Sequence, residues 1–222
     1  MRILVTAAGR AIGHATCSAL TEAGHEVVAT ARDVSMLDDL DVALRLALDV
    51  TDDASVRAAV DAAGEIDGLV NNAALGGSAP IEVYPIDHMR DMFETNVLGA
   101  LRMVQHVVPG MRDRGHGVIV NISSVQGRVT SPLSGAYSAS KHALEAISEA
   151  MHFELAHFGI RTVTIEPGFI APGMKQVDDL PRPAIYQQLY DEWEGADTTL
   201  NAEGRPGPEI VANAIVRAVA DP

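Results

Sequence analysis

Short apolar runs alternate along the chain with longer stretches in which apolar residues recur with the period of an amphipathic helix. The apolar runs are rich in Val, Ile and Leu and carry few charged residues, a pattern typical of strands covered on both faces. We therefore predict six strands, at residues 3–6, 26–30, 43–48, 68–70, 117–122 and 161–165.

The helical stretches lie between these runs, and three of them stop at or near a glycine: Gly24, Gly64 and Gly159. Alternating strands and helices imply right-handed crossovers and one parallel sheet. The predicted fold class is therefore α/β, a doubly wound parallel sheet, with residues 1–222 forming a single domain. The helices are predicted at residues 12–23, 53–63, 87–113, 137–157 and 208–219.

Two stretches interrupt this alternation. Residues 32–42 leave room for only a short helix between the second and third strands. Residues 171–207 form a long segment rich in proline and acidic residues. A connection of that length in a compact domain usually contains local helix or has a function of its own.

Composition narrows the classes of protein to which the chain can belong. It has 222 residues, 47% hydrophobic and 21% charged, which is typical of a globular domain and excludes a mainly disordered chain. Its formal net charge is −14, so we expect no binding to nucleic acid or to anionic membranes. Cys17 is the only cysteine, which excludes an internal disulfide, and we expect it to be buried.

Further classes of site and location are excluded by motifs that the chain lacks. The histidines have no spacing that indicates a metal site. No apolar run is long enough to span a membrane, and no secretory leader precedes the first strand. We therefore expect a cytoplasmic protein without a metal.

The first predicted strand leads into a loop of small residues, Thr6–Gly13, which is followed by a helix. Such a loop lets backbone amides approach a pyrophosphate, and the start of the helix favours its negative charge. The strict GxGxxG pattern is absent. The loop by itself is thus equally well explained as a plain tight turn.

Tyr137 and Lys141 are four residues apart, on one face of a predicted helix. An ammonium group at this position favours the phenolate and is expected to lower the pKa of the phenol. Such a pair suits proton transfer to or from an alcohol oxygen. Ser124 follows a central strand, at the sheet edge where α/β folds bind ligands.

With these residues the chain resembles the short-chain dehydrogenase/reductase superfamily over nearly its whole length. The resemblance implies a Rossmann-type fold with strand order 3-2-1-4-5-6; because the chain stops soon after the last helix, we expect no seventh strand. It implies that Ser124, Tyr137, Lys141 and Asn96 are the catalytic residues. The resemblance and the two arginines discussed below together predict the cofactor-binding residues. They are Thr6, Gly9, Arg10, Ile12, Gly13, Arg32, Asp49, Val50, Asn72, Ala73, Tyr137, Lys141, Pro167, Gly168 and Ile170.

The resemblance also implies a role for each catalytic residue. Tyr137 is the general acid in reduction and the general base in oxidation. Ser124 binds the substrate oxygen, and its spacing of thirteen residues from Tyr137 favours it over Ser123. Lys141 lowers the pKa of Tyr137 and holds the nicotinamide ribose. Asn96 anchors a water that connects Lys141 to solvent; the alternative for Asn96 is a residue that kinks its helix.

Cofactor preference is predicted from the end of the second strand, where NAD-preferring members carry an acidic residue. Ala31 occupies this place and Arg32 follows it, while Arg10 lies in the first loop. Two arginines here suit a 2′-phosphate, so NADP(H) is the predicted cofactor. NAD(H) is the alternative cofactor, because Asp33 could contact a ribose. In a second alternative, both arginines simply point to solvent.

Several residues depart from the family pattern or are specific to this chain. Ala7 and Ala11 replace loop glycines and are expected to crowd the backbone. Pro172 replaces a threonine that bonds the carboxamide, so the nicotinamide is expected to be held differently. Residues 171–207 match the substrate loop, in which four apolar residues either line a pocket or pack the loop onto the domain: Met174, Leu180, Leu189 and Trp193.

These features together predict an oxidoreductase that transfers hydride between NADP(H) and a small to medium, apolar carbonyl or secondary alcohol. The alternatives are an NAD-dependent alcohol dehydrogenase and a cofactor-binding regulator without turnover. The resemblance also implies a homo-oligomer built on the two long helices. Without a seventh strand we expect a homodimer, with a tetramer as the alternative.

Overall fold

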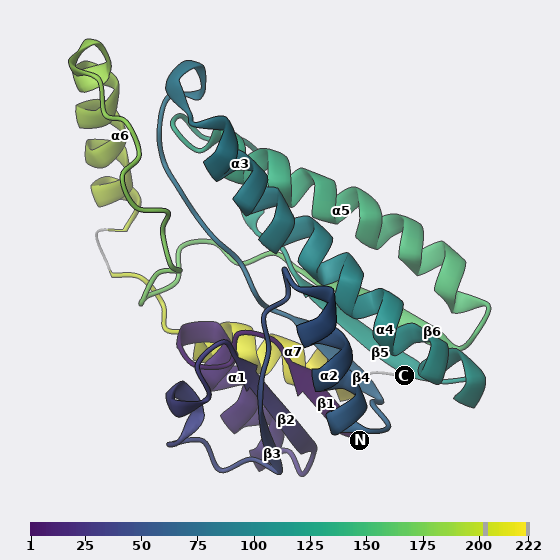
Figure 1. The fold of residues 1–222 in the computed structure, drawn as a ribbon. Helices are drawn as coiled ribbons and strands as arrows, with labels where there is room; N and C mark the ends of the chain where they lie inside the picture. The colour runs from purple at the N-terminus through teal and green to yellow at the C-terminus, as the bar shows by residue number, and fades with distance from the viewer. Residues whose placement is uncertain (202–203, 221–222) are drawn as a thin grey trace.

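The computed structural model describes residues 1–201 and 204–220. Within them, six strands form one fully parallel sheet in the order β3-β2-β1-β4-β5-β6, which confirms the predicted Rossmann order (Figure 1). The strands are β1 (Arg2–Val5), β2 (Glu26–Ala31), β3 (Leu44–Ala47), β4 (Gly68–Asn71), β5 (Gly117–Ile122) and β6 (Ile160–Ile165).

Helices cover both faces of this sheet. On one face α1 packs against α7, and on the other α2, α4 and α5 lie against the strands (Figure 1). Seven α-helices occur in the described residues: α1 (Ala11–Glu22), α2 (Asp53–Ala63), α3 (Ile86–Phe93), α4 (Gly99–Arg114), α5 (Gly135–Ala156), α6 (Gln187–Leu200) and α7 (Glu209–Ala220).

Alternate residues of the strands pack into two separate hydrophobic cores, one on each face of the sheet. Ile3 and Val5 of β1 pack with α1 and α7, whereas Leu4 between them packs on the opposite face with α2 and α4. Both faces are therefore buried, which explains the nearly continuous apolar runs in the sequence. Cys17 lies in the first of these cores, as predicted, and burial raises the pKa of its thiol to about 12.

The predicted helix at residues 87–113 is present, but it contains a π-helical turn that the sequence did not predict. The chain forms α3, then a π-helical turn over Glu94–Leu98, and then α4. A π turn inserts one residue into the helical ladder and is often found at functional sites. Asn96 lies in this turn, which agrees with the helix-kink interpretation of that residue.

The long segment that was predicted to be mixed contains a regular helix. A 3₁₀ turn at Ala184–Tyr186 leads into α6, which stands apart from the sheet at the end of the molecule (Figure 1). Between β2 and β3 lies the predicted short helix, a 3₁₀ turn at Val34–Leu37. The domain boundary predicted for residues 1–222 stays a prediction.

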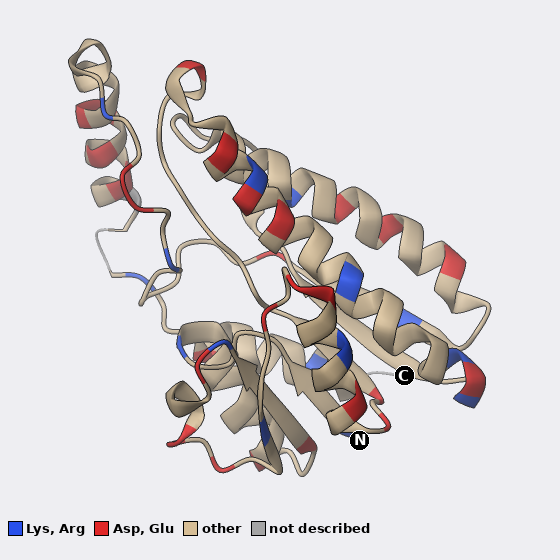
Figure 2. Ribbon diagram, viewed as in Figure 1, with Lys and Arg blue, Asp and Glu red and all other residues tan. Residues whose placement is uncertain are grey.

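Charges are distributed over the surface rather than segregated. Acidic side chains occupy the exposed faces of α3, α5 and α6, with basic ones scattered between them (Figure 2). In residues 1–201 and 204–220, no group of His, Cys, Asp and Glu could hold a metal ion. No helix in these ranges is both long and apolar enough to cross a membrane.

Candidate active site

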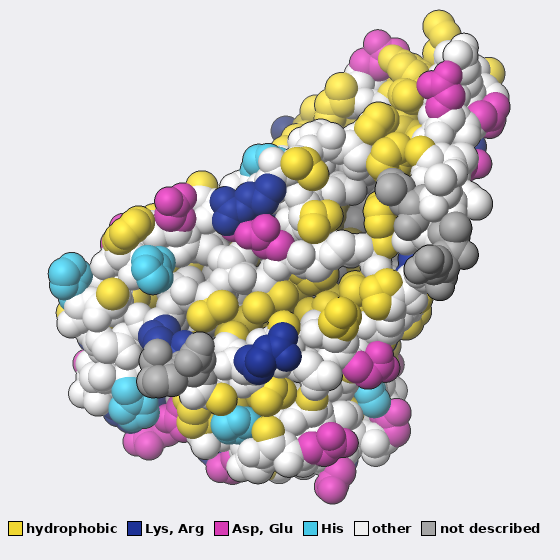
Figure 3. Space-filling model, turned by 180° about the vertical axis from the view of Figure 1, so that it is seen from behind, with side chains coloured by type: hydrophobic (Ala, Val, Ile, Leu, Met, Phe, Trp, Pro, Cys, Tyr) yellow, Lys and Arg dark blue, Asp and Glu magenta, His cyan; other side chains and the backbone are white. Residues whose placement is uncertain are grey.

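A cavity of about 420 Å³ opens at the carboxyl ends of the strands. Its walls come from the loop after β1, the loop after β4, the end of β5, the start of α5, the segment after β6, α6, and Arg205. In Figure 3 hydrophobic side chains gather in the middle of one face of the molecule and continue up the projecting end. Parallel α/β sheets bind ligands at this edge.

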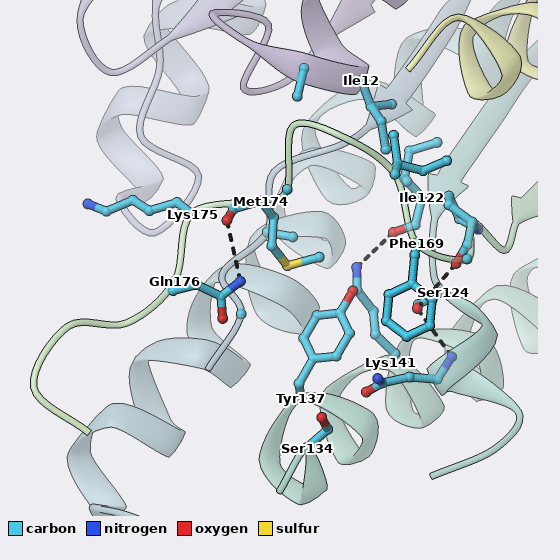
Figure 4. A pocket seen from close by; sticks show the side chains of 18 of the residues that line it. Ile12, Ile122, Ser124, Ser134, Tyr137, Lys141, Phe169, Met174, Lys175 and Gln176 are labelled. Carbon is cyan, nitrogen blue, oxygen red and sulfur yellow. Dashed lines mark hydrogen bonds between the residues drawn. The ribbon is translucent and has the colours of Figure 1, made fainter. Parts of the chain in front are cut away.

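Three of the four predicted catalytic residues line this cavity: Ser124, Tyr137 and Lys141. Lys141 is only 2% exposed, and its Nζ donates a hydrogen bond to the carbonyl of Ile122 at 2.7 Å (Figure 4). The same Nζ lies 5.8 Å from the centre of the Tyr137 ring. The helix thus presents the phenol and the amine to the same space, as the four-residue spacing predicted.

The predicted lowering of the Tyr137 pKa by Lys141 stays a prediction, because burial is the larger influence on the phenol in this structure. Burial raises the pKa of Tyr137 to about 12, and the nearby Ser124 hydroxyl only partly offsets the increase. Burial also lowers the pKa of Lys141 to about 8. The physical reason is that both groups are desolvated, while the ammonium is directed to the Ile122 carbonyl. The site therefore holds a neutral phenol that can donate a proton.

Ser124 is held by the backbone around it. Its Oγ accepts a hydrogen bond from the Gln126 amide at 3.1 Å and donates a long one to the Pro167 carbonyl at 3.4 Å. The Ser123 hydroxyl is buried beside Gly127 and has no partner among the described residues. This arrangement supports the choice of Ser124 over Ser123 as the residue that binds the substrate oxygen.

Asn96 does not line the cavity but supports it from behind. Its Oδ1 accepts from the Leu75 amide at 2.7 Å, and its Nδ2 donates to the Leu75 carbonyl at 2.9 Å and to Ser140 Oγ at 3.0 Å. These bonds tie the π turn to the loop after β4 and to α5. Both N–H donors are used within the protein, and the predicted water relay stays a prediction.

The departures from the family glycines have a measurable backbone effect. Ala7 and Ala11 adopt φ of 52° and 47°, the left-handed region in which a Cβ is strained. Gly13 permits the close approach of helix and loop, since a Cβ there would lie 2.5 Å from the Ala7 carbonyl oxygen. The predicted crowding is thus present as backbone strain at two positions, and the tight turn is preserved.

The start of α1 fits a pyrophosphate. Arg10 is its N-cap residue and makes no side-chain cap, so the first amides of the helix are not satisfied by a capping side chain. Arg10 and Ile12 line the cavity together with Tyr137 and Lys141. An anion at α1 and a nicotinamide near Tyr137 would therefore share one continuous space. A nicotinamide dinucleotide supplies or accepts the hydride when it is bound.

The predicted cofactor residues divide into two groups. The cavity brings together Arg10, Ile12, Asn72, Tyr137, Lys141, Pro167, Gly168 and Ile170. It does not include Thr6, Gly9, Gly13, Arg32, Asp49, Val50 and Ala73.

Most of the second group have a positioning role in the structure. Thr6 Oγ1 accepts from the amides of Asn72 and Ala73 at 2.9 and 3.0 Å, which fixes the loop after β4. Gly9 packs against the side chain of Met36, and Val50 is buried in the core. Arg32 is exposed just after β2 and attracts the Asp49 carboxylate. Direct contact of these residues with a cofactor stays a prediction.

The substrate loop contributes two of the four predicted apolar residues, Met174 and Trp193, to the cavity. Leu180 packs instead against a small core beneath α3 and α5, and Leu189 lies outside the cavity. The loop pairs with the segment after β4 through Gly76, whose amide donates to the Lys175 carbonyl at 2.9 Å. Pro172 lines the cavity as well.

Sequence reasoning missed several lining residues. Phe169 lies between two predicted residues and could have been found from its position. Gln126 follows Ser124 by two positions, and its amide is part of the wall. Asp197 and Arg205 form an ion pair and also line the cavity. No sequence motif indicated either residue.

Comparison with known proteins decides the family. The sequence profile of the short chain dehydrogenase family matches residues 1–181. The chain belongs to this family. It is similar to an uncharacterized oxidoreductase of Bacillus subtilis, with 46% identity over 125 residues that cover 55% of this chain and 45% of that protein. The match therefore spans less than half of the relative's length.

Two further short-chain dehydrogenase relatives bear on the site. A 3-ketodihydrosphingosine reductase of Bacteroides thetaiotaomicron is 37% identical over 170 residues, 75% of this chain and 62% of that protein. The crystal structure of a short-chain dehydrogenase from Streptomyces avermitilis superposes with a TM-score of 0.86 at 34% identity, covering 96% of this chain and 82% of that one. Solved members of the family bind NAD+ or NADP.

Proposed function

We propose that this oxidoreductase transfers a hydride between NADP(H) and an apolar carbonyl or secondary alcohol. The observation that carries the proposal is a single cavity that is lined both by Arg10 and by Ser124, Tyr137 and Lys141. A cation for a phosphate and a proton donor for an oxygen are thus parts of one site. The whole protein's activity is inferred from this site together with its family.

The chain's own groups complete the reaction around the hydride. In reduction, the carbonyl carbon gains the hydride, and the Tyr137 hydroxyl donates its proton to the carbonyl oxygen. The Ser124 hydroxyl donates a hydrogen bond to the same oxygen and stabilises its developing negative charge. The Lys141 ammonium then lies close enough to stabilise the phenolate that remains, until a proton returns from solvent.

The preference for NADP(H) rests on the end of β2. This strand ends at Ala31, so no carboxylate occupies the position at which an NAD-preferring site binds ribose hydroxyls. The Asp33 carboxylate accepts hydrogen bonds from the amide and the hydroxyl of Ser35, at 3.0 and 2.7 Å. Asp33 therefore caps a 3₁₀ turn, and this weakens the alternative in which it binds NAD.

The substrate class follows from the cavity wall. Phe169, Met174 and Trp193 contribute apolar surface to the same cavity that Tyr137 and Ser124 line. Such a wall fits an apolar ketone or secondary alcohol. The similarity to a 3-ketodihydrosphingosine reductase supports a carbonyl on a lipophilic chain.

The experiment is a pair of fluorescence titrations with NADPH and NADH, on the wild type and on Arg10→Ala and Arg32→Ala. We expect NADPH to bind more tightly to the wild type, and each variant to lose about tenfold of that preference, the effect of one charge-assisted contact. Arg57→Ala, an exposed arginine on α2, is the matched control. Tighter binding of NADH to the wild type would contradict the proposal and favour an NAD-dependent alcohol dehydrogenase.

A cofactor-binding regulator without turnover is the second candidate, favoured by the strained backbone at Ala7 and Ala11. Tyr137→Phe separates the two. An enzyme loses its turnover of an apolar ketone but retains its NADPH affinity in this variant. If the wild type binds NADPH but shows no turnover, this result would favour the regulator.

We further infer that the chain acts on a small molecule as a homodimer, in which the neighbouring α4 and α5 helices pack against those of a second copy. The exposed Leu98 ends the π turn directly before α4, and the exposed Phe153 lies on α5. Light scattering at working concentration tests the dimer, and a tetramer or a monomer would contradict it. The cytoplasmic location stays a prediction.

A further inference from the structure

A buried acid lies one helical turn beyond the catalytic lysine. Glu145 follows Lys141 by four residues on α5, so the two side chains share a helix face. The Glu145 side chain is only 7% exposed, and Lys141 is 2% exposed. Two groups that ordinarily carry opposite charges are therefore buried on one face of the same helix.

The Glu145 carboxylate is incompletely compensated by its contacts. Its Oε2 lies 3.0 Å from Nη2 of Arg128, but the Arg128 side chain is 58% exposed and also binds Glu166 at 3.0 Å. Its Oε1 is buried without a hydrogen-bond partner in the described part of the chain. Burying a charge is costly unless another charge balances it. Lys141 is the buried cation on the same helix face.

The other groups around Lys141 carry no negative charge. From α5 it faces the Tyr137 phenol, and from β5 it meets the Ile122 carbonyl. The Ser123 and Ser124 hydroxyls follow on the same strand end, and the Glu166 side chain, after β6, is 33% exposed, against 7% for Glu145. Glu145 is therefore the carboxylate placed to act on Lys141, and its charge opposes the effect of burial on the lysine pKa.

We propose that Glu145 is a positioning residue of this active site: its buried carboxylate keeps Lys141 in the ammonium form and is itself held in place by Arg128. The inference rests on the proposed function for its catalytic meaning. The charge relationship between Glu145 and Lys141 is independent of that function. It can therefore be tested without substrate or cofactor.

The chain offers an unusually clean experiment because its sequence contains only two lysines, Lys141 and Lys175. With carbon-13-labelled lysine, NMR can follow both ε-methylene signals through a pH titration of the full chain. Lys175 is exposed and serves as the internal reference. The variants are Glu145→Gln, Glu145→Asp and, as a matched control, Glu149→Gln, which removes an exposed carboxylate one turn further along α5.

In Glu145→Gln we expect the Lys141 titration midpoint to fall by about one pH unit, a tenfold loss of proton affinity. Glu145→Asp shortens the side chain and moves the carboxylate away without removing its charge. The Lys141 titration midpoint should therefore fall by less in this variant. Glu149→Gln and the Lys175 signal should not change. Should Glu145→Gln fail to fold, Glu145→Asp decides alone, because an unchanged Lys141 midpoint in that variant overturns the proposal. An unchanged midpoint in a folded Glu145→Gln overturns it equally.

A kinetic measurement then links the charge to the reaction. With an identified substrate, Glu145→Gln should lower kcat for alcohol oxidation about twofold at pH 7 and about tenfold at pH 9, with little change in KM, because a neutral Lys141 no longer stabilises the Tyr137 phenolate. A shifted NMR midpoint without any turnover in the wild type would refute the proposed function but not the role of Glu145. Equal loss in Glu149→Gln would refute the role of Glu145.

Discussion

The side chain of Asn96 donates a hydrogen bond to Ser140 Oγ at 3.0 Å, and Ser140 in turn donates to the backbone carbonyl of Tyr137 at 2.7 Å. The π turn is thereby connected to the first turn of α5, at the residue that carries the phenol. Asn96 is 1% exposed and Ser140 is fully buried. The position of Tyr137 thus depends on a residue that does not reach the cavity.

We predict that Asn96→Ala destabilises the protein by about 2–3 kcal/mol, because it leaves the Leu75 backbone groups without their buried partner and removes the donor to Ser140 Oγ. Urea denaturation followed by circular dichroism measures the change. Asn213→Ala, on the exposed side of α7, is the control and should change the free energy of unfolding by less than about 0.5 kcal/mol. Equal stability of the two variants would contradict the role given to Asn96.

Ala7→Gly and Ala11→Gly should each stabilise the protein by about 1 kcal/mol, because glycine relieves the left-handed backbone at these positions. Ala15→Gly, inside α1, is the matched control and should destabilise by about 1 kcal/mol. Thermal denaturation of the three variants checks the opposite signs. A loss of stability in all three would show that the loop is not strained.

Gly13→Ala should destabilise the protein by about 2 kcal/mol, because the added Cβ would meet the Ala7 carbonyl oxygen at 2.5 Å and Ala8 Cα at 2.9 Å. These are backbone atoms, so a side-chain rotation cannot relieve the overlap. The same shift should weaken NADPH binding at the start of α1. In Gly195→Ala, where the new Cβ has no neighbour within 4 Å, stability should not decrease. Urea denaturation and a NADPH titration measure both effects.

Lys141 should make stability depend on pH. Its pKa falls on folding from 10.5 to about 8, so between these values the unfolded chain binds more protons than the folded one. Stability contributed by this residue therefore rises with pH from about 8 to 10.5, by about 3 kcal/mol.

Comparing the wild type with Lys141→Met isolates this contribution, because groups such as Tyr137 titrate in both proteins. The variant should gain stability relative to the wild type at pH 7, and this advantage should shrink by about 3 kcal/mol at pH 10.5. Lys175→Met, at an exposed position, should show no such dependence. A constant difference between wild type and Lys141→Met across the range would contradict the lowered pKa.

Much of the site could be predicted from the sequence because its parts are local. Tyr137 and Lys141 share a helix face by their spacing, and Ser124 follows a strand that ends at the same sheet edge. Local sequence patterns could not predict the surroundings of each of these side chains. The apolar periodicity of residues 87–113 continues through the π turn, so the break at Asn96 gave no signal. The cavity positions of Asp197 and Arg205 depend on how segments far apart in the sequence meet.

The sequence by itself determined the parallel sheet, because strand-helix alternation and short apolar runs admit few right-handed arrangements, and its resemblance to the family implied the strand order. It also predicted which residues carry the chemistry. Only the tertiary structure decided their protonation and support. Burial raises the pKa of Tyr137 and lowers that of Lys141, and it places Glu145 behind them. Desolvation depends on everything packed around a group, which a pattern along the chain does not contain.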